Sequence, residues 1–481
     1  MKYETVIGLE VHAQLLTKSK MFCGCSADYA STPPNTHVCP VCMGMPGVLP
    51  VINRQAVEFT MMTALALNCP ISEYTKFDRK NYPYPDLMKG YQISQYDAPI
   101  GQKGWLNIEV DGETRKIGIT RVHLEEDTAK LVHRSSPGGG DYSLVDVNRA
   151  GTPLMEIVGE PDIRSPEEAR QYLIKLRSIL QYLGVSTGNM EEGSFRCDAN
   201  ISIRPEGTTE LGAKVEVKNM NSFKAVFLAM EYEVQRQTKA VIEGKKLVQE
   251  TRGWVEDKGK TVSQRSKEYA HDYRYFPEPD LPPLTISREW VEEVRAKLPE
   301  LPEEKRNRFM SEYGLPKYDA DLLTGSKAMA DYFEEGTGKD VTPKEASNWL
   351  LGEVTRIINA NNIDIDAFKE KVAPDRLAGL IASSHQTINT ATAKSVLEDM
   401  FTTGKSAAAI IEEQGLSQIS DTQELEKIVS EVINSNAQPV ADFRAGKETA
   451  FKFLVGQVMR ATKGQANPQL VNEVLKKKLA E

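Results

Sequence analysis

Residues 6–15, VIGLEVHAQL, most constrain the fold of this chain, because apolar and polar side chains alternate along them. Side chains on a strand point alternately to opposite faces, so Ile7, Leu9 and Val11 would share one face while Glu10 and His12 share the other. Residues two apart on a strand lie about 7 Å apart and project the same way, which leaves room for a metal ion and an anion. The alternative is an edge strand whose polar face is only solvated.

The same alternation returns three times, in residues 120–127, 196–204 and 214–218. Each segment carries a carboxylate together with Arg, Lys or His on one face. Four such strands predict an antiparallel sheet with one face on a core. Carboxylates this dense repel one another unless a cation neutralises them, and interleaved arginines are suited to a phosphate. The shared polar face therefore predicts a Mg²⁺–nucleotide site.

A further segment, residues 146–158, continues the sheet and places Glu156 among apolar neighbours. Burying a carboxylate without compensation is costly. We therefore expect a cation beside Glu156.

The segment 76–86 is polar, aromatic and punctuated by prolines, which predicts a loop rather than a helix. It carries Arg79 and Lys80 beside Tyr82 and Tyr84. These residues line a polar channel, cover a nucleotide or belong to a rigid surface loop.

Four cysteines are clustered, as Cys23-Gly-Cys25 and Cys39-Pro-Val-Cys42-Met-Gly44. Clustered Cys pairs in a cytoplasmic protein indicate a metal before a disulfide. The second pair has the form of a zinc knuckle, in which the Gly lets backbone amides turn toward the sulfurs. We predict that the four cysteines hold one structural Zn²⁺. The alternative is four reduced thiols in a loop that has lost its metal.

At 481 residues the chain is too long for one core, and its strand and helix patterns segregate. Helices are expected at 56–68, 166–183 and 222–242. After the prolines of residues 299–302, strand signals vanish and helical patterns run to the end. We predict an α+β fold with three domains: an antiparallel-sheet domain at 1–293, an all-α domain at 294–405 and a small all-α tail domain at 406–481.

Composition is that of an ordinary globular protein, with 40% hydrophobic and 26% charged residues and a net charge of −9. This charge argues against a basic nucleic-acid surface over the whole chain, although residues 441–481 are locally basic. No apolar run approaches a membrane span, and the first residues do not form a signal peptide. We therefore expect a cytoplasmic protein without a membrane partner.

Seven motifs together resemble the B subunits of the aspartyl/glutamyl-tRNA amidotransferases, over essentially the whole chain. They are VIGLEVH (6–12), FDRKNY (77–82), YQISQ (91–95), EED (125–127), EGSFRCDANIS (192–202), DYRYFPEPD (272–280) and KGQANP (463–468). The resemblance implies a cradle domain similar to the catalytic domain of glutamine synthetase. It also implies a helical domain and a YqeY-type tail domain that grip tRNA.

The resemblance implies an activity as well. The B subunit would activate the side-chain carboxylate of misacylated Asp-tRNA(Asn) or Glu-tRNA(Gln) with ATP. The A subunit, an amidase-type glutaminase, would release ammonia from glutamine, and the small C subunit would brace the two in a heterotrimer. The chain lacks the Gly-Ser signature of the amidase-type glutaminase, so ammonia would arrive from that partner.

The family's Mg²⁺ ligands fall on His12, Glu125 and Glu156, in agreement with the strand argument. The candidate catalytic residues are Glu10, Glu125, Asp198, Glu216 and Lys80. The candidate nucleotide-binding residues are Arg196, Lys214 and Arg121. Glu10, Asp198 and Glu216 would be further ligands, residues behind the ligands or a second metal site. Family members differ over the cysteine cluster, and this chain keeps all four cysteines.

The tail is predicted to bind tRNA. Residues 447–462 show a helical pattern, Gly464 supplies a break, and residues 469–479 form a helix that ends in three lysines. A loop of small residues between basic helices lets the backbone approach RNA, where shape and phosphate are read. The alternative for the lysines is simple capping of the helix dipole.

Two other functions stay open. A metal-stabilised tRNA-binding scaffold without chemistry would explain the cysteines and the basic tail, but not four ionic strand faces. An archaeal-type Glu-tRNA-specific large subunit would carry a synthetase-like insertion, and no segment of this chain is long enough to be one.

Overall fold

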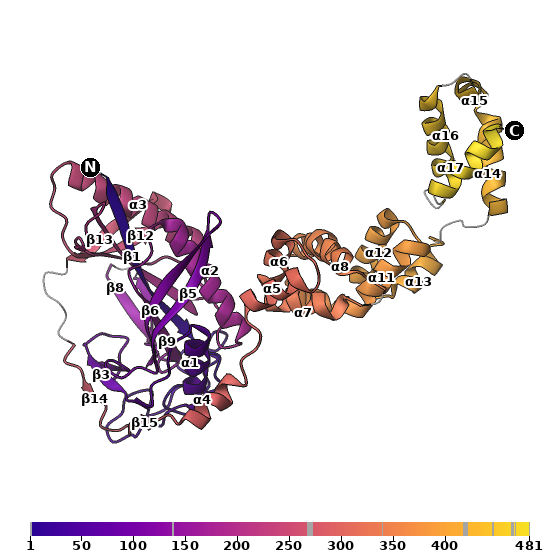
Figure 1. The fold of residues 1–481 in the computed structure, drawn as a ribbon. Coiled ribbons are helices and arrows are strands. Elements are labelled where there is room, and N and C mark those ends of the chain that lie inside the picture. Colours follow the sequence, from indigo (N-terminus) through magenta and orange to yellow (C-terminus); the bar gives the residue numbers. More distant parts are fainter. Residues whose placement is uncertain are drawn as a thin grey trace. The chain divides into compact units, whose positions relative to one another are not determined.

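The computed structural model describes residues 2–136, 139–266, 273–338, 340–416, 422–444, 447–462, 466 and 468–480. The chain divides into two compact units, residues 1–302 and 303–481, which are described separately. The first unit combines strands and helices, whereas the second is built from helices (Figure 1).

An eleven-stranded sheet forms the first unit. Ten strands follow one another in the order β13-β12-β11-β10-β1-β9-β6-β4-β3-β14, and β5 pairs with β6. The pairs are antiparallel except β11 with β12, which is parallel. The strands are β1 (Tyr3–Gln14), β3 (Asp78–Asn81), β4 (Tyr91–Ser94), β5 (Gly101–Val110), β6 (Glu113–Glu126), β9 (Pro153–Gly159), β10 (Phe195–Pro205), β11 (Val215–Lys218), β12 (Glu250–Val255), β13 (Lys260–Ser266) and β14 (Phe276–Pro277).

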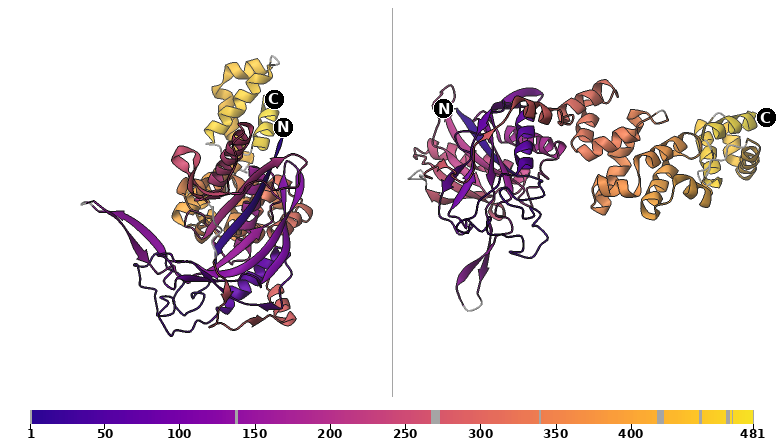
Figure 2. Two further views of the ribbon diagram at one scale, coloured as in Figure 1. Left: turned by 90° about the vertical axis from the view of Figure 1, so that its left-hand side faces the viewer. Right: turned by 90° about the horizontal axis from the view of Figure 1, so that it is seen from below.

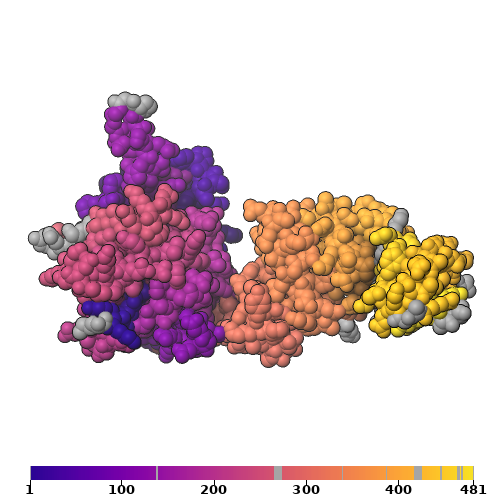
Figure 3. Space-filling view, turned by 90° about the horizontal axis from the view of Figure 1, so that it is seen from above, coloured from indigo at the N-terminus to yellow at the C-terminus, as the bar shows by residue number. Residues whose placement is uncertain are grey.

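Two short ladders lie outside this sheet. β2 (Tyr74–Thr75) pairs with β15 (Leu284–Thr285), and β7 (Lys130–Ser135) pairs with β8 (Asp141–Asp146). The β7–β8 pair extends away from the sheet as a hairpin (Figure 2). Figure 3 shows this hairpin standing out from the surface of its unit.

The alternation along β1 divides the sheet into an apolar and a polar face. Ile7, Leu9 and Val11 are at most 1% exposed, whereas Glu10 and His12 between them stay partly exposed. The apolar side chains enter the main hydrophobic core of the unit. The polar side chains point to the opposite face, as the period of two predicts.

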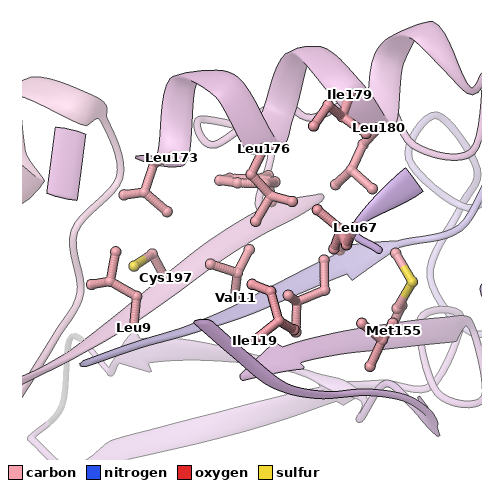
Figure 4. Packing of buried hydrophobic residues seen from close by; sticks show 14 of the residues in the cluster. Leu9, Val11, Leu67, Ile119, Met155, Leu173, Leu176, Ile179, Leu180 and Cys197 are labelled. Carbon is pink, nitrogen blue, oxygen red and sulfur yellow. The ribbon is translucent and has the colours of Figure 1, made fainter. Parts of the chain in front are cut away.

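Four helices share that core: α1 (Arg54–Ala66), α2 (Pro166–Tyr182), α3 (Phe223–Ile242) and α4 (Arg288–Arg295). Leu173 and Leu176 of α2 face the apolar side chains of the strands (Figure 4). The side chains of Ser165 and Ser222 cap α2 and α3 by accepting backbone N–H groups of the first turn.

The helices of the second unit pack into two hydrophobic clusters, one joining α5 to α13 and the other joining α14 to α17. A π-helical turn, Leu350–Val354, links α8 to α9. The helices are α5 (Pro302–Ser311), α6 (Lys317–Thr324), α7 (Lys327–Gly336), α8 (Pro343–Trp349), α9 (Thr355–Asn361), α10 (Ile365–Lys371), α11 (Pro374–Gln386), α12 (Thr390–Thr403), α13 (Ala407–Glu413), α14 (Thr422–Ser435), α15 (Ala437–Arg444), α16 (Glu448–Ala461) and α17 (Pro468–Ala480).

The predicted α+β fold, with its sheet domain followed by helices, is confirmed. The parallel pair β11–β12 is the exception to an antiparallel sheet. The boundaries at 293/294 and 405/406 stay predictions. Leu298 and Leu301 pack against the core of the first unit, and α13 joins the cluster of α5 to α12.

The segment 76–86, predicted as a loop, contains strand β3. Its prolines, Pro83 and Pro85, lie after the strand, so residues 78–81 keep the N–H groups that pairing with β4 and β14 requires. In the tail, the two predicted helices are α16 and α17, and the predicted break at Gly464 lies outside the described residues. Among the helices that the structure describes, none is long and apolar enough to cross a membrane.

Candidate active site

Strand pairing aligns four polar residues in one row across the sheet. His12 of β1 pairs with Arg196 of β10 on one side and with Glu156 of β9 on the other. Glu156 in turn pairs with His123 of β6. Paired residues on neighbouring strands project to the same face, so side chains from distant parts of the chain meet on the polar face.

Glu125, two residues beyond His123 on β6, completes a cluster with His12 and Glu156. Nε2 of His12 lies 3.6 Å from Oε1 of Glu125 and 3.6 Å from Oε2 of Glu156. The three possible ligand atoms all lie within 4.8 Å of one another. Nε2 of His123 lies 3.2 Å from Oε2 of Glu156. The predicted Mg²⁺ ligands are therefore close enough to hold one ion.

The two carboxylates of this His12–Glu125–Glu156 cluster are buried, whereas His12 is partly exposed. Glu125 is 3% exposed and Glu156 is 9% exposed. Burial, followed by the charge of Glu156, raises the pKa of Glu125. Burial acts in the same direction on Glu156, but the charges of His123, His12 and Arg121 hold the pKa of Glu156 well below its usual range. The two adjacent carboxylates, Glu125 and Glu156, thus interact with the same neighbouring imidazoles, those of His12 and His123.

A divalent cation fits this donor set. Mg²⁺ binds through one or two carboxylates and keeps several water ligands, although imidazole is the donor that suits it least. An ion between Glu125 and Glu156 would remove the repulsion that raises the pKa of Glu125. The assignment of the cluster to Mg²⁺ stays a prediction.

A second group of carboxylates lies around Lys218 at the end of β11. Glu10 and Asp198 pair across β1 and β10. Nζ of Lys218 lies 2.5 Å from Asp198 and 3.2 Å from Glu216. Burial alone would lower the pKa of Lys218, but the charges of Asp198 and Glu216 raise it. Two predicted site residues, Asp198 and Glu216, therefore lie beside a charged ammonium group, while Glu10 accepts a hydrogen bond from the side-chain amide of Asn200 at 2.8 Å.

Two of the predicted basic residues act on the carboxylate pair. The charge of Lys80, on β3, lowers the pKa of Glu125, and the charge of Arg121, on β6, lowers that of Glu156. Nζ of Lys80 also lies 4.9 Å from the ring centre of Tyr273. Both cations are thus near the His12–Glu125–Glu156 cluster.

The other two predicted basic residues have different surroundings. The guanidinium of Arg196 lies 3.1 Å from Asp127, a buried carboxylate at the end of β6. Lys214 lies just ahead of β11 and is exposed. The lysine that reaches Asp198 and Glu216 is Lys218, at the other end of that strand.

His123 and Lys218 were not selected from the sequence, although both share strand faces with selected residues. His123 precedes Glu125 by two positions, and Lys218 follows Glu216 by two. The period of two does place both on the polar strand faces, but it does not distinguish them as site residues. Which carboxylate each contacts depends on pairing between strands and has no local signal.

The four predicted zinc ligands come together in the loop after β1. The sulfur atoms of Cys23, Cys25, Cys39 and Cys42 all lie within 4.8 Å of one another. A tetrahedral Zn–Cys₄ site needs sulfurs about 3.8 Å apart, so small side-chain movements suffice to bind the ion. Gly44 has a φ of +65°, and the N–H of Cys39 donates to Sγ of Cys42 at 3.2 Å.

The thiols of this cluster influence one another's protonation. A hydrogen bond with Cys23 is the largest cause that lowers the pKa of Cys42, to about 4. Burial is the largest cause that raises the pKa of Cys25, to about 11. One thiolate is therefore stable without a metal, and a cation is needed to hold the whole set as thiolates.

Comparison with known proteins identifies the family of this chain. A family model described as the GatB/GatE catalytic domain matches residues 5–292, and a second, described as the GatB domain, matches residues 331–479. The first match contains the His12–Glu125–Glu156 cluster and the four clustered cysteines.

Relatives match over the full length. The B subunit of aspartyl/glutamyl-tRNA(Asn/Gln) amidotransferase from Dehalococcoides mccartyi is 64% identical over 100% of this chain and 99% of its own. The proteins of the same name from Moorella thermoacetica and Caldanaerobacter subterraneus are 57% and 56% identical, over 100% of both chains. The resemblance seen in the seven motifs is thereby confirmed. The chain belongs to the family of aspartyl/glutamyl-tRNA(Asn/Gln) amidotransferase B subunits.

Proposed function

We propose that this chain phosphorylates the side-chain carboxylate of Asp-tRNA(Asn) or Glu-tRNA(Gln) with ATP and presents the activated group to ammonia. The observation that carries the proposal is the pair of buried carboxylates, Glu125 and Glu156, which lie close enough to Nε2 of His12 for the three side chains to hold one ion. Phosphoryl transfer depends on positioning and on charge neutralisation more than on a protein nucleophile. A sheet face lined with carboxylates and basic side chains offers both.

The chemistry takes two steps. An oxygen of the substrate carboxylate attacks the γ-phosphorus of ATP, the bond to the β-phosphate oxygen breaks, and ADP leaves. Ammonia then attacks the acyl carbon of the resulting acyl phosphate, and phosphate leaves with the bonding electrons. The nitrogen gives up one proton as the amide forms. Activation is needed because a free carboxylate is a poor acyl donor.

His12, Glu125 and Glu156 would hold the ion. When bound, Mg²⁺ supplies positive charge to the phosphate oxygens during transfer. Lys80 and Arg121, whose charges already reach the carboxylate pair, would neutralise the phosphate on the opposite side.

The residues around Lys218 would receive the nucleotide. Lys218 fixes Asp198 and Glu216 by ion pairs, and Thr251 donates to Glu216 at 2.8 Å. Arg196 is held in place by Asp127 and remains about one third exposed. An ordered cation next to ordered carboxylates suits a polyphosphate that arrives with its own metal ions. Lys214 would contact the nucleotide from its position ahead of β11.

Ammonia would come from a partner. The relatives are named as the B subunit of an amidotransferase, and the sequence lacks the Gly-Ser signature of an amidase-type glutaminase. We infer that a glutaminase, the A subunit, uses glutamine as the amide donor, and that the small C subunit braces a heterotrimer in the cytoplasm. The four clustered cysteines would hold a structural Zn²⁺ outside the chemical step.

The helical tail would grip tRNA. Leu454 and Val458 of α16 pack in one cluster with α17, while Lys476 and Lys477 of α17 are exposed. A chain ending at residue 421 keeps Ile411, which is 5% exposed, in the core of α5 to α13. This truncation should still assemble and bind ATP, but its dissociation constant for tRNA should rise and depend less steeply on salt. An unchanged dissociation constant at fixed salt would contradict the role of the tail.

The test of the activity is phosphate release by the assembled complex with ATP, Mg²⁺, glutamine and each misacylated tRNA in turn. We expect one phosphate per amide formed, and none with correctly acylated tRNA as the control. The amidated products identify which misacylated tRNA is used. Tight tRNA binding with no phosphate release would instead favour a scaffold without chemistry.

A further inference from the structure

Four tyrosines form a continuous wall on the β3, β4 and β14 side of the sheet. Tyr96 stacks on Tyr275, with ring centres 4.1 Å apart and planes 12° from parallel. Tyr275 meets Tyr273 edge to face at 6.1 Å, and Tyr273 meets Tyr82 in the same way at 5.8 Å. We call these four residues the tyrosine wall.

The tyrosine wall adjoins the His12–Glu125–Glu156 cluster. Ser94, the last residue of β4, pairs with Glu125 and lies 3.3 Å from its carboxylate. The next residue, Gln95, exchanges two hydrogen bonds with Leu124, at 3.1 Å and 3.0 Å. Tyr96 follows directly. Tyr96, the first tyrosine of the wall, thus lies two residues after Ser94, which pairs with Glu125.

Both ends of the tyrosine wall are held rigidly. The N–H of Tyr96 donates to Asp78 at 3.3 Å, and Lys76 bridges Asp78 and Asp97 at 2.5 Å and 2.6 Å. On the other side, Asn81 donates its side-chain amide to the carbonyl of Arg274 at 2.8 Å.

Arg274, between Tyr273 and Tyr275, has a φ of +44°, which a side chain other than Gly adopts only where the surroundings hold it. The N–H of Asn81 donates to the carbonyl of Tyr273 at 2.9 Å and supplies part of that hold. A surface ordered in advance loses little entropy when a ligand settles on it.

Tyr96 nevertheless remains 52% exposed. A stacked neighbour covers one face of a ring, so the exposed surface of Tyr96 includes the other face and the edge. An exposed aromatic ring that is backed by a second ring and fixed beside a reactive centre is a platform for a flat ligand.

The strand order places two different surfaces on opposite sides of the His12–Glu125–Glu156 cluster, one suited to the nucleotide and one suited to the tRNA end. The residues around Lys218 come from β1, β10 and β11, whereas the tyrosine wall comes from the region of β4, β3 and β14, beyond β9 and β6. The cations and carboxylates of the first side suit a polyphosphate. The second side presents aromatic rings, which are the usual partners of unpaired nucleobases.

We propose that Tyr96, backed by Tyr275, stacks the adenine base at the 3′ end of the aminoacyl-tRNA. This inference rests on the proposed function, in which the reacting amino acid is esterified to the ribose of that same nucleotide. The base must therefore lie within one nucleotide of the carboxylate that is phosphorylated. Stacking there would hold the amino-acid side chain toward Glu125 and Glu156.

The test compares Tyr96→Leu, Tyr96→Phe and a matched control, Tyr74→Leu, in the assembled complex. Tyr74 lies on β2 and is 53% exposed, so the control removes an equally exposed tyrosine. Each variant is measured with tRNA that ends in adenosine and with tRNA whose last nucleotide is abasic. Thermal unfolding of each variant checks that the fold is retained.

We expect Tyr96→Leu to raise the dissociation constant for adenosine-ended tRNA about tenfold and to leave that for abasic tRNA unchanged. Tyr96→Phe and Tyr74→Leu should bind both tRNAs like the wild type. An equal loss with both tRNAs, or a raised KM for ATP with unchanged tRNA binding, would overturn the proposal. The dissociation constants are measured without ATP, so they test stacking even if the complex forms no amide, an outcome that would reject only the proposed function.

Discussion

Two charge clusters, one in each unit of the chain, differ in the cations that contact their carboxylates. In the helical unit, Nζ of Lys305 lies 2.8 Å from both Asp331 and Glu334, and Arg308 lies 2.6 Å from Glu334. In the sheet unit, Glu125 and Glu156 share two imidazoles at 3.2–3.6 Å, and Lys80 and Arg121 act on them as charges farther away. In the helical cluster a lysine and an arginine contact the carboxylates directly, whereas in the sheet cluster two imidazoles do.

The pKa shifts express the same difference. Burial alone would raise the pKa values of Asp331 and Glu334, but hydrogen bonds from Lys305 to both, from Lys327 to Asp331 and from Arg308 to Glu334 lower them. In the sheet cluster the two carboxylates differ: burial and the charge of Glu156 raise the pKa of Glu125, whereas the charges of His123, His12 and Arg121 overcome burial and lower the pKa of Glu156. Fully paired carboxylates stabilise a fold, whereas opposite pKa shifts on two adjacent buried carboxylates are typical of functional sites.

The largest expected effect is on activity. Glu125→Gln should lower the rate of amide formation by on the order of 10³-fold, because the ion and the transferred phosphate lose one anionic ligand. Stability should not fall, because the substitution also removes one of two repelling carboxylates. The control is Glu113→Gln on the same strand, whose side chain is 75% exposed. Near-normal turnover would remove Glu125 from the site.

The cysteine cluster extends the comparison, since its four side chains also form a group that could hold a metal ion. Cys39→Ser should reduce the zinc content from about one ion per chain to about none and lower the melting temperature. Cys69→Ser, which changes a buried thiol outside the cluster, should keep the zinc. Metal analysis and thermal unfolding of the purified complex measure both. Freely titratable thiols and no zinc in the wild type would reject the site.

Lys305→Met should destabilise the helical unit by about 2 kcal/mol, because it removes the buried ammonium group that Asp331 and Glu334 share, although Lys327 and Arg308 still pair with these partly exposed carboxylates. Amide hydrogen exchange in α5 and α7 reports this loss locally. Lys327→Met removes an exposed partner of Asp331 and should cost less than about 1 kcal/mol. Equal protection in both variants would mean that the buried contacts of Lys305 add nothing.

The smallest effect concerns pH. Asp331 and Glu334 have folded-state pKa values below their unfolded values of about 4. They therefore stabilise the fold above that pH, and the contribution is lost as the pH falls through the folded pKa. The stability gap between the wild type and Lys305→Met should narrow by about 1 kcal/mol between pH 7 and pH 3. A constant gap in amide exchange would show that the lysine does not depress these pKa values.

Sequence reasoning reached what depends on local patterns. The period of two selected Glu10, His12 and Glu125, and the spacing of the cysteines predicted their cluster, because a single strand or loop determines each. The sequence alone did not predict contacts that depend on which strands pair. That β9 lies between β1 and β6, and so brings Glu156 between His12 and His123, follows from strand order alone.

The same limit explains two smaller differences. β3 went unpredicted because its pairing partners, β4 and β14, lie elsewhere in the chain. Lys214 and Lys218 lie four residues apart, so the period of two puts them on the same face and does not distinguish them. Lys214 was selected, but it precedes β11, and Lys218 at the other end of that strand is the residue that contacts Asp198.

The position of β1 has a consequence for synthesis of the chain. Its two neighbours, β9 and β10, end at residues 159 and 205, so β1 has no partner on either edge until residue 159 has been made, and none on its second edge until residue 205 has been made. At 5–20 residues per second that wait lasts about 10 s or more. Throughout it, Ile7, Leu9 and Val11 and at least one unpaired strand edge are open to other nascent chains. We therefore expect Tyr3–Gln14 to need shielding while the chain is being made.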